Sequence, residues 1–399
     1  SVFSTPLSHV NLRATAWGVP NAGYRKALKD YQELDGKVVF FEVGDRAHTL
    51  RIATEQEIAE YRRRRKQRRT VAIPPADLKT ANMPMLTALR VNQAHIYGSK
   101  TANLGEIASA RLKQVQVPSG FGLPFFYYQR HIRANQLDKK IEELLNDPKF
   151  ATDMRWRKAN LETLRNAIIE TPIEPKILDA IYNRVRIKLK GRGVFVRSST
   201  NAEDLEGFNG AGLYDTVPNV QGKANLGRAV KTVWASLWNF GAVEERNLFG
   251  IDHRQVFAGV LIQTGVNADA AGVLITTNLY NPEDLNSYTI NAKRGLGIRV
   301  VEGTRIPEQV IHDLSNDGTK IISRSDDPYM LVFDDKGGIQ EVENTHRGVI
   351  LTEERAKRLS QAVKSFASLF SARHALDVEW LLQGETVWIV QARPYVDRR

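Results

Sequence analysis

Short apolar runs separated by turn signals predict a chain of mixed α/β type. Apolar residues repeat at helical spacing between residues 174 and 190, where Ile181 and Val185 fall on one face. Helices are predicted over residues 103–115, 155–170, 174–190, 224–247 and 353–371, and strands over residues 194–196, 256–264 and 271–277. Within the helix at 224–247 we expect Trp234, Leu237 and Trp238 to belong to a hydrophobic core.

Two apolar-rich runs near the end of the chain, residues 376–382 and 386–392, flank Gln383-Gly384-Glu385 and predict a closing hairpin. With residue 384 at its centre, Asp377 is expected opposite Gln391. Side chains alternate along a strand, which predicts a polar face of Asp377, Glu379, Gln391 and Arg393 and an opposite face of Val378, Trp380, Val390 and Ala392. Two carboxylates and an amide oxygen suit Mg²⁺. The alternative is a hairpin whose polar face is solvated.

The composition indicates how many domains the chain can form and excludes several classes of functional site. A chain of 399 residues suits two or three domains, and 42% hydrophobic residues suffice for their cores. The absence of cysteine excludes disulfides, thiolate catalysis and cysteine zinc sites. No apolar stretch is long enough for a bilayer and no leader is visible, so we expect a soluble, cytoplasmic protein without a membrane partner.

Turn and charge patterns divide the chain into three parts. Residues 1–53 predict a small α/β unit that lacks its beginning, so we expect further upstream domains of the same protein. Residues 54–81 predict a charged helix, with its basic end at residues 62–69, followed by a Pro-rich linker. A second domain is expected over residues 82–399.

The basic run at residues 62–69 supplies seven of the eleven net positive charges. Such a run can bind nucleic acid or another polyanion, or it can be a solvated helix end. Only Tyr61 stands beside it, whereas single-strand binding uses interleaved aromatic residues. A solvated helix end is therefore favoured, and nucleic acid is not expected as a partner.

A glycine-rich stretch after the strand at 194–196 carries the signature of a phosphate site. Arg197 stands at the strand end and can bind phosphate oxygens in a fork, while Gly207, Gly210 and Gly212 permit a nest of backbone N–H groups. The run at 98–101 is not a Walker motif, because Ser99 and Ala94 stand where glycines are required. The pattern Gly295-Leu296-Gly297 is too short for a dinucleotide fingerprint.

Three segments in order resemble the ATP-grasp nucleotide-binding domain of phosphoenolpyruvate synthases, pyruvate phosphate dikinases and glucan water dikinases. They are the run Lys100-Thr101-Ala102-Asn103-Leu104-Gly105-Glu106, the loop after Arg197 and the closing hairpin, within about residues 92–396. The resemblance implies a two-lobed α/β (α+β) ATP-grasp domain that binds ATP and Mg²⁺. By the same likeness, Lys100 and Arg197 contact the ATP phosphates, Gly210 and Gly212 approach the nucleotide, and Gln263 lies on the strand along adenine.

The resemblance also implies a metal–phosphate centre in the hairpin. Glu379 and Gln391 hold magnesium and phosphate with Asp377 beside them, and Arg393 supports the transfer together with Arg197. One position departs from the family pattern. The family usually has Gly-Leu-Gly-Glu, whereas this chain has Ile298 in place of the glutamate, which puts nucleotide affinity in doubt.

The N-terminus resembles the swivelling phosphohistidine domain of the same family, here truncated. The resemblance rests on Ser8-His9 before an apolar helix, the turn Gly18-Val19-Pro20 and the run at 34–39. On chemistry alone, a single histidine after serine is more often structural than nucleophilic. The resemblance implies that His9 is the catalytic nucleophile that carries a covalent phosphoryl group.

Together these likenesses imply an ATP-dependent phosphotransferase of the dikinase type. His9 receives phosphate from Mg-ATP and passes it to an acceptor, either pyruvate or a glucan, while water takes the other phosphate. The order of domains resembles that of glucan water dikinases, and the acceptor is left open. The alternative is a regulatory or nucleic-acid-binding protein that keeps the ATP-grasp fold without turnover, which the basic run and Ile298 favour.

Overall fold

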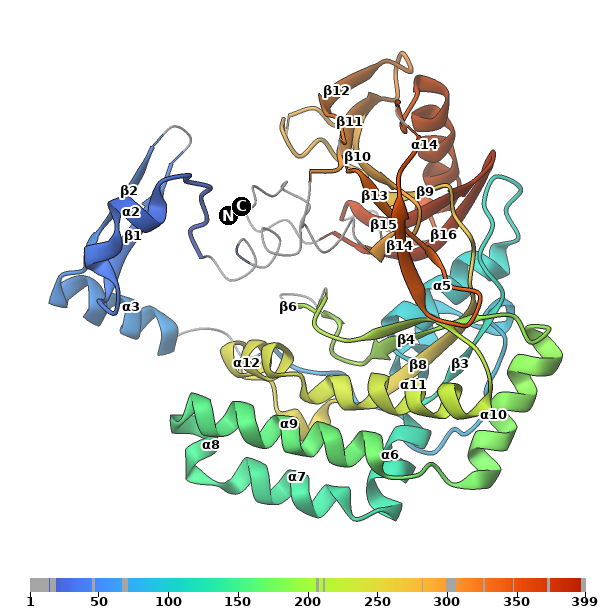
Figure 1. Ribbon diagram of the computed structural model, residues 1–399, viewed down its shortest axis with the longest axis horizontal. Coiled ribbons are helices and arrows are strands. Elements are labelled where there is room, and N and C mark those ends of the chain that lie inside the picture. The colour runs from blue at the N-terminus through green and yellow to red at the C-terminus, as the bar shows by residue number, and fades with distance from the viewer. Residues whose placement is uncertain are drawn as a thin grey trace.

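The computed structural model describes residues 14, 19–44, 47–66, 71–205, 208–210, 212–281, 283–298, 306–325, 327–346, 348–371 and 374–395. His9, Gly207 and residues 67–69 of the basic run lie outside the described residues. Within them, two main sheets with surrounding helices confirm the mixed α/β class (Figure 1). No helix of this described part combines the length and apolar character needed to span a membrane.

Residues 19–66 form a small N-terminal unit, drawn in blue to one side in Figure 1. Its elements are α2 (Ala27–Asp30), η1 (Gln32–Leu34), β1 (Val39–Val43), β2 (His48–Ile52) and α3 (Glu55–Lys66). The strands pair antiparallel, with Val39 opposite Ile52. Among residues 19–44 and 47–63, whose burial the structure describes, none is buried, so within this part the hairpin and helix enclose no hydrophobic core.

Helix α3 begins where a capping box predicts. The Thr54 N–H donates to the Glu57 carboxylate at 2.8 Å, and the Glu57 N–H donates to the Thr54 hydroxyl at 3.3 Å. Arg51 adds a bidentate pair to the same carboxylate. This arrangement confirms the charged helix expected from residue 54.

The first lobe contains a four-stranded antiparallel sheet in the order β3-β8-β4-β7. Helices lie below this sheet in Figure 1, and together they enclose one core that includes Trp234, Leu237 and Trp238 as predicted. Its elements are β3 (Gly120–Leu123), α6 (Phe125–Ala134), α7 (Leu137–Asn146), α8 (Pro148–Thr152), α9 (Met154–Glu170), α10 (Pro175–Lys188), β4 (Val194–Thr200), β5 (Asp204–Leu205), β6 (Phe208–Asn209), β7 (Thr216–Val220), α11 (Lys223–Ala235), η4 (Ser236–Trp238), α12 (Phe240–Leu248), η5 (His253–Gln255) and β8 (Ala258–Thr264).

The single helix predicted over 224–247 is wrong, because the chain breaks it after Ala235. A 3-10 turn follows, Asn239 adopts a non-helical conformation (φ −56°, ψ 134°), and α12 then starts at Phe240. All residues from 233 to 238 are buried. One straight helix presents only one face to a core, so the break lets this whole segment be enclosed.

The second lobe contains a six-stranded antiparallel sheet in the order β12-β11-β10-β9-β15-β16, with a separate β13-β14 hairpin. Its elements are β9 (Ala270–Ile275), β10 (Ser287–Arg294), β11 (Glu308–Asp313), β12 (Thr319–Ser323), β13 (Tyr329–Phe333), β14 (Ile339–Glu343), α14 (Glu353–Ala367), β15 (Leu376–Gln383) and β16 (Thr386–Pro394). Helix α14 and the sheet share a second core. The helix ends four residues before the predicted end at 371.

Helix α5 (Ser99–Ala110) lies between the two sheets, preceded by η2 (Leu86–Ala88), η3 (Val91–Gln93) and α4 (Ala94–Tyr97). Leu104 and Ile107 join the core of the second lobe, where Leu261 of β8 also packs. Helix α5 begins four residues and ends five residues before the helix predicted over 103–115. Gly98 starts it at positive φ and Arg111 ends it in a left-handed conformation.

The second core depends on a close approach between Trp380 and Gly272. A Cβ on Gly272 would overlap both the Asn291 carbonyl oxygen and the buried Trp380 ring. We predict that Gly272→Ala lowers the free energy of unfolding by about 3 kcal/mol through overpacking, measured by urea denaturation. Gly241→Ala is the control, because its Cβ meets no atom within 4 Å in helix α12. Equal stability of the two variants would contradict this role of Gly272.

Candidate active site

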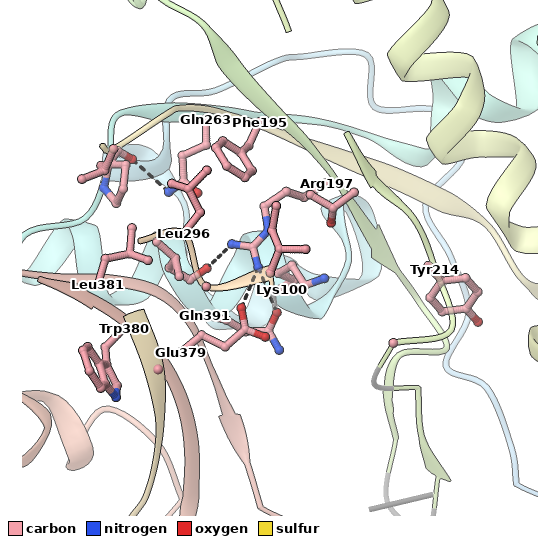
Figure 2. Close-up of a pocket in the computed structure, with 18 of the residues that line it drawn as sticks. Lys100, Phe195, Arg197, Tyr214, Gln263, Leu296, Glu379, Trp380, Leu381 and Gln391 are labelled. Carbon is pink, nitrogen blue, oxygen red and sulfur yellow. Dashed lines mark hydrogen bonds and ion pairs between the residues drawn. The ribbon is translucent and has the colours of Figure 1, made fainter. Parts of the chain in front are cut away.

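A cavity of about 410 Å³ lies between the two sheets, and both lobes supply its walls (Figure 2). Polar and charged residues line one part of it, and apolar residues line another. The charged and amide side chains among them are Lys100, Arg197, Glu203, Asp215, Gln263, Glu379, Gln391 and Arg393. The apolar side chains include Phe195, Val266, Leu296, Ile298, Leu381 and Val390.

Arg197 joins the two lobes across this cavity. Strand β4 of the first lobe carries it, and its guanidinium points to the hairpin of the second lobe in Figure 2. One terminal nitrogen lies 2.9 Å from a Glu379 carboxylate oxygen and 3.4 Å from the Gln391 amide oxygen. The other donates to the Val390 carbonyl. Three groups of the hairpin thus hold one buried cation in a fixed orientation.

The hairpin itself has a different register from the one predicted. Asp377 pairs with Arg393, and Glu379 pairs with Gln391. Two features shift the register by one position each: Gln383 pairs with Thr386, so the turn contains only Gly384 and Glu385, and a β-bulge follows Glu379. The bulge adds Val390 to one strand, so one residue of β16 has no partner on β15. Val390 was expected on the face opposite the polar residues, but it lines the cavity with them. The polar residues still share one face, although their partners are shifted by two positions.

Asp377 and Arg393 form a buried ion pair within this face. The Arg393 guanidinium donates twice to one Asp377 oxygen, at 2.9 and 2.7 Å. Burial raises the pKa of the Asp377 carboxyl above its ordinary value, and the charge of Arg393 opposes that shift. Arg393 lines the cavity whereas Asp377 does not. In this structure Asp377 therefore contacts the cavity through Arg393.

Helix α5 brings Lys100 to the cavity from its first turn. The helix can start there because Gly98 approaches strand β4 so closely that a Cβ would overlap the Ser199 carbonyl. The Thr101 N–H also donates to the Ser199 hydroxyl at 3.0 Å. The Lys100 ammonium lies 2.8 Å from a Glu203 carboxylate oxygen, and both side chains are buried.

Glu203 was not among the predicted site residues. It stands between Arg197 and the glycines of the loop, which is the only signal that the sequence offers. Its partner Lys100 lies about a hundred residues earlier, so no local spacing reveals the pair. The backbone of Glu203 also supports the loop, since the Gly210 N–H donates to the Glu203 carbonyl at 2.7 Å.

The two predicted glycines that the structure describes have different positions. Gly212 lines the cavity at a φ of +65°, a conformation that glycine adopts without strain. Gly210 is not part of the lining. A Cβ on Gly210 would lie 2.9 Å from the Glu203 carbonyl oxygen, so this glycine permits the close packing at the base of the loop.

The other end of the cavity is mainly apolar. Gln263 of β8 lies there beside Phe195 in Figure 2, and its side-chain N–H donates to the Pro118 carbonyl at 3.0 Å. Ile298, the departure from the family pattern, is a further apolar part of the lining. A flat apolar group can fit this end while anionic groups face Lys100 and Arg197.

Glu379 and Gln391 are paired directly across the hairpin, so their carboxylate and amide oxygens could bind one magnesium ion together. Both residues line the cavity, and about a quarter of the Glu379 side chain is exposed there. Carboxylate and amide oxygens are ligands that Mg²⁺ accepts, usually together with phosphate and water. Among the described residues, no group of three His, Cys, Asp or Glu side chains could hold a metal.

Comparison with known proteins finds a family match over the part of the chain that forms this cavity. The sequence profile of the family described as "Pyruvate phosphate dikinase, AMP/ATP-binding domain" matches residues 94–398. The chain is 32% identical to the "Probable phosphoenolpyruvate synthase" of Staphylothermus marinus, over 75% of this chain and 39% of that protein. It is 29% identical to the rifampicin phosphotransferase of Bacillus cereus (76% and 34%) and 30% identical to the phosphoenolpyruvate synthase of Escherichia coli (77% and 41%).

The chain thus spans well under half the length of these curated relatives. A solved structure of D-alanyl-alanine synthetase A from Vibrio cholerae is 13% identical over 60% of this chain and 54% of that one. Its TM-score of 0.24 is too low to carry an argument about the fold.

The Asp377–Arg393 pair generates a stability prediction. We expect Arg393→Gln to lower the free energy of unfolding by about 3–5 kcal/mol, because a buried carboxylate loses its cation. An acid whose pKa is raised by folding destabilises the fold above that pKa, so the loss should shrink as the pH falls. Urea denaturation between pH 4 and 8 measures both effects.

The double variant Asp377→Asn/Arg393→Gln is the control for this prediction. It replaces the charged pair by two amides that can form a hydrogen bond, so it should regain most of the lost stability. If the two substitutions reduce stability additively, the residues do not act as a pair.

Proposed function

The chain belongs to the family of pyruvate phosphate dikinase AMP/ATP-binding domains, and from this membership we propose that it is the nucleotide-binding part of a dikinase-type phosphotransferase. In this proposal ATP occupies the cavity between the lobes of an ATP-grasp domain. Its base lies at the apolar end near Gln263, and its phosphates face Lys100, Arg197 and Arg393. The acceptor then receives a phosphoryl group from a histidine of the same protein.

One observation carries the proposal: the Arg197 guanidinium is held at the junction of the lobes by Glu379 and Gln391. A planar guanidinium matches two phosphate oxygens in a fork. Lys100 and Arg393 add two further cations to the same cavity. Phosphoryl transfer relies mainly on positioning and charge neutralisation, and this cluster of three cations supplies both.

Glu379 and Gln391 are proposed to hold the magnesium ion that accompanies ATP. When bound, the ion neutralises phosphate charge. Asp377, expected as a third ligand, supports the site by orienting Arg393 through its two hydrogen bonds. Arg197 keeps both ligand side chains directed into the cavity.

His9 is proposed as the phosphoryl carrier. Its imidazole nitrogen attacks the β-phosphorus of ATP, which releases AMP and transfers a pyrophosphoryl group. Water then removes the γ-phosphate as inorganic phosphate, and the remaining phosphoryl group passes to the acceptor. Relatives are named for phosphoenolpyruvate synthesis and for rifampicin phosphorylation. Pyruvate, a glucan and a hydroxyl group of a small molecule are the acceptors to compare.

The first functional prediction concerns His9. Incubation with ATP labelled separately at the β and γ positions should leave the β label on the protein in an acid-labile form and release AMP. His9→Ala should abolish the labelling while ATP affinity stays within about threefold, because in this proposal the imidazole acts as the nucleophile and does not bind ATP. His346→Ala, at an exposed position, is the control. Labelled His9→Ala protein would remove His9 from the mechanism.

The second functional prediction concerns Glu379. Glu379→Gln keeps an oxygen for Arg197 but removes the charge that holds magnesium against the triphosphate. We expect the phosphorylation rate to fall about a hundredfold, or about 3 kcal/mol, with a higher magnesium requirement. Glu385→Gln makes the same change at the exposed turn of the hairpin and should have no effect. An unchanged rate and magnesium dependence in Glu379→Gln would place the site elsewhere.

A further inference from the structure

Asn239 occupies the N-cap position of helix α12 but does not cap it. An N-cap asparagine normally accepts a hydrogen bond from a backbone N–H of the first turn. Here no such bond forms, and the side-chain amide instead donates to the Leu213 carbonyl at 3.1 Å and to the Asp215 carboxylate at 2.9 Å. The Asn239 side chain thus forms hydrogen bonds with a neighbouring segment and not with the first turn of α12.

A second residue of α12 reaches the same segment. Arg246 is almost completely buried, and its guanidinium donates to the Tyr214 hydroxyl at 3.5 Å, to the Leu237 carbonyl at 2.6 Å and to His253 Nδ1 at 2.9 Å. Because the guanidinium can only donate, Nδ1 of His253 accepts. The hydrogen of the ring is then on Nε2, which lies 2.9 Å from the Asn247 side-chain oxygen. Burial, with nearby arginine charges, lowers the pKa of His253 to about 3.

The acceptors around Arg246 are therefore a phenol, a carbonyl and a neutral imidazole. Burial of a cation among neutral acceptors is costly, and the Trp238 ring, whose centroid lies 5.9 Å from the guanidinium carbon, is a further neutral neighbour. Asn239 and Arg246 form hydrogen bonds with the same neighbouring segment. Asn239 and Arg246 together bind all three residues of 213–215, which directly follow Gly212.

This segment is part of the cavity wall. Gly212, Tyr214 and Asp215 all line the cavity, and Tyr214 stands opposite the Arg197 cluster in Figure 2. We propose that Asn239 and Arg246 are positioning residues that hold the stem of the glycine-rich loop, residues 213–215, in place before the nucleotide binds. The proposal rests on the proposed function, because it assumes that ATP is what enters the cavity.

Asn239→Asp separates positioning from stability. Aspartate is at least as good an N-cap as asparagine, so α12 and the thermal unfolding midpoint should be maintained. The new carboxylate cannot donate, and it faces the Leu213 carbonyl and the Asp215 carboxylate. We expect the Kd for Mg-ATP, measured by calorimetry, to rise about tenfold, and the KM for ATP to rise while kcat stays within about twofold.

Asn225→Asp is the matched control, since it makes the same substitution in the first turn of α11 and away from the cavity. Asn239→Ser is the second variant, because serine also caps helices but has no amide donor. Weaker ATP binding in both Asn239 variants with an unchanged unfolding midpoint supports the positioning role. An unchanged Kd in both, or a weaker Kd that only follows a loss of folded protein, overturns it. Failure of the parent protein to bind Mg-ATP would instead refute the proposed function.

Discussion

The ion pair between Arg197 and Glu379 relates the two lobes to each other at the centre of the cavity. One partner comes from the four-stranded sheet and the other from the six-stranded sheet. The bond to the Val390 carbonyl adds a directional constraint that a single charge pair lacks. Rotation of either lobe would separate these groups. Arg197 therefore helps to fix the distance across the cavity, together with the amide of Asn219, which donates to the Gly338 carbonyl at 2.8 Å, and that of Asn103, which donates to the Ala392 carbonyl at 3.0 Å.

Another ion pair at the cavity, between the buried side chains of Lys100 and Glu203, has the same physical consequence. Buried ion pairs contribute little net stability, but removing one partner alone is costly. A polyanion that enters the cavity supplies a replacement for the carboxylate beside each cation. The cations can therefore change partners at modest cost, and the carboxylates keep them oriented until they do.

Local patterns were sufficient for many elements of this structure and insufficient for others. The hairpin at the end of the chain and the strand that carries Arg197 follow from alternation and turn residues. The pairing of Asp377 with Arg393 does not, because alternation alone reveals neither the two-residue turn nor the bulge after Glu379. The pair of Lys100 and Glu203 was missed because its two residues are far apart in sequence. The break at Asn239 arises from burial on all sides of residues 233–238, which helical periodicity does not encode.

The bulge at Val390 has a consequence for how this hairpin can change during evolution. Side chains alternate along a strand, so one deleted or inserted residue between Glu379 and Gln391 along either strand would reverse the faces of everything beyond it. Glu379 and Gln391 would then no longer face the cavity together. Substitutions preserve the spacing, whereas length changes do not, except in the turn around Gly384. We therefore expect a change in the length of β15 or β16 to disturb the cavity more than most substitutions within these strands, unless a further bulge absorbs it.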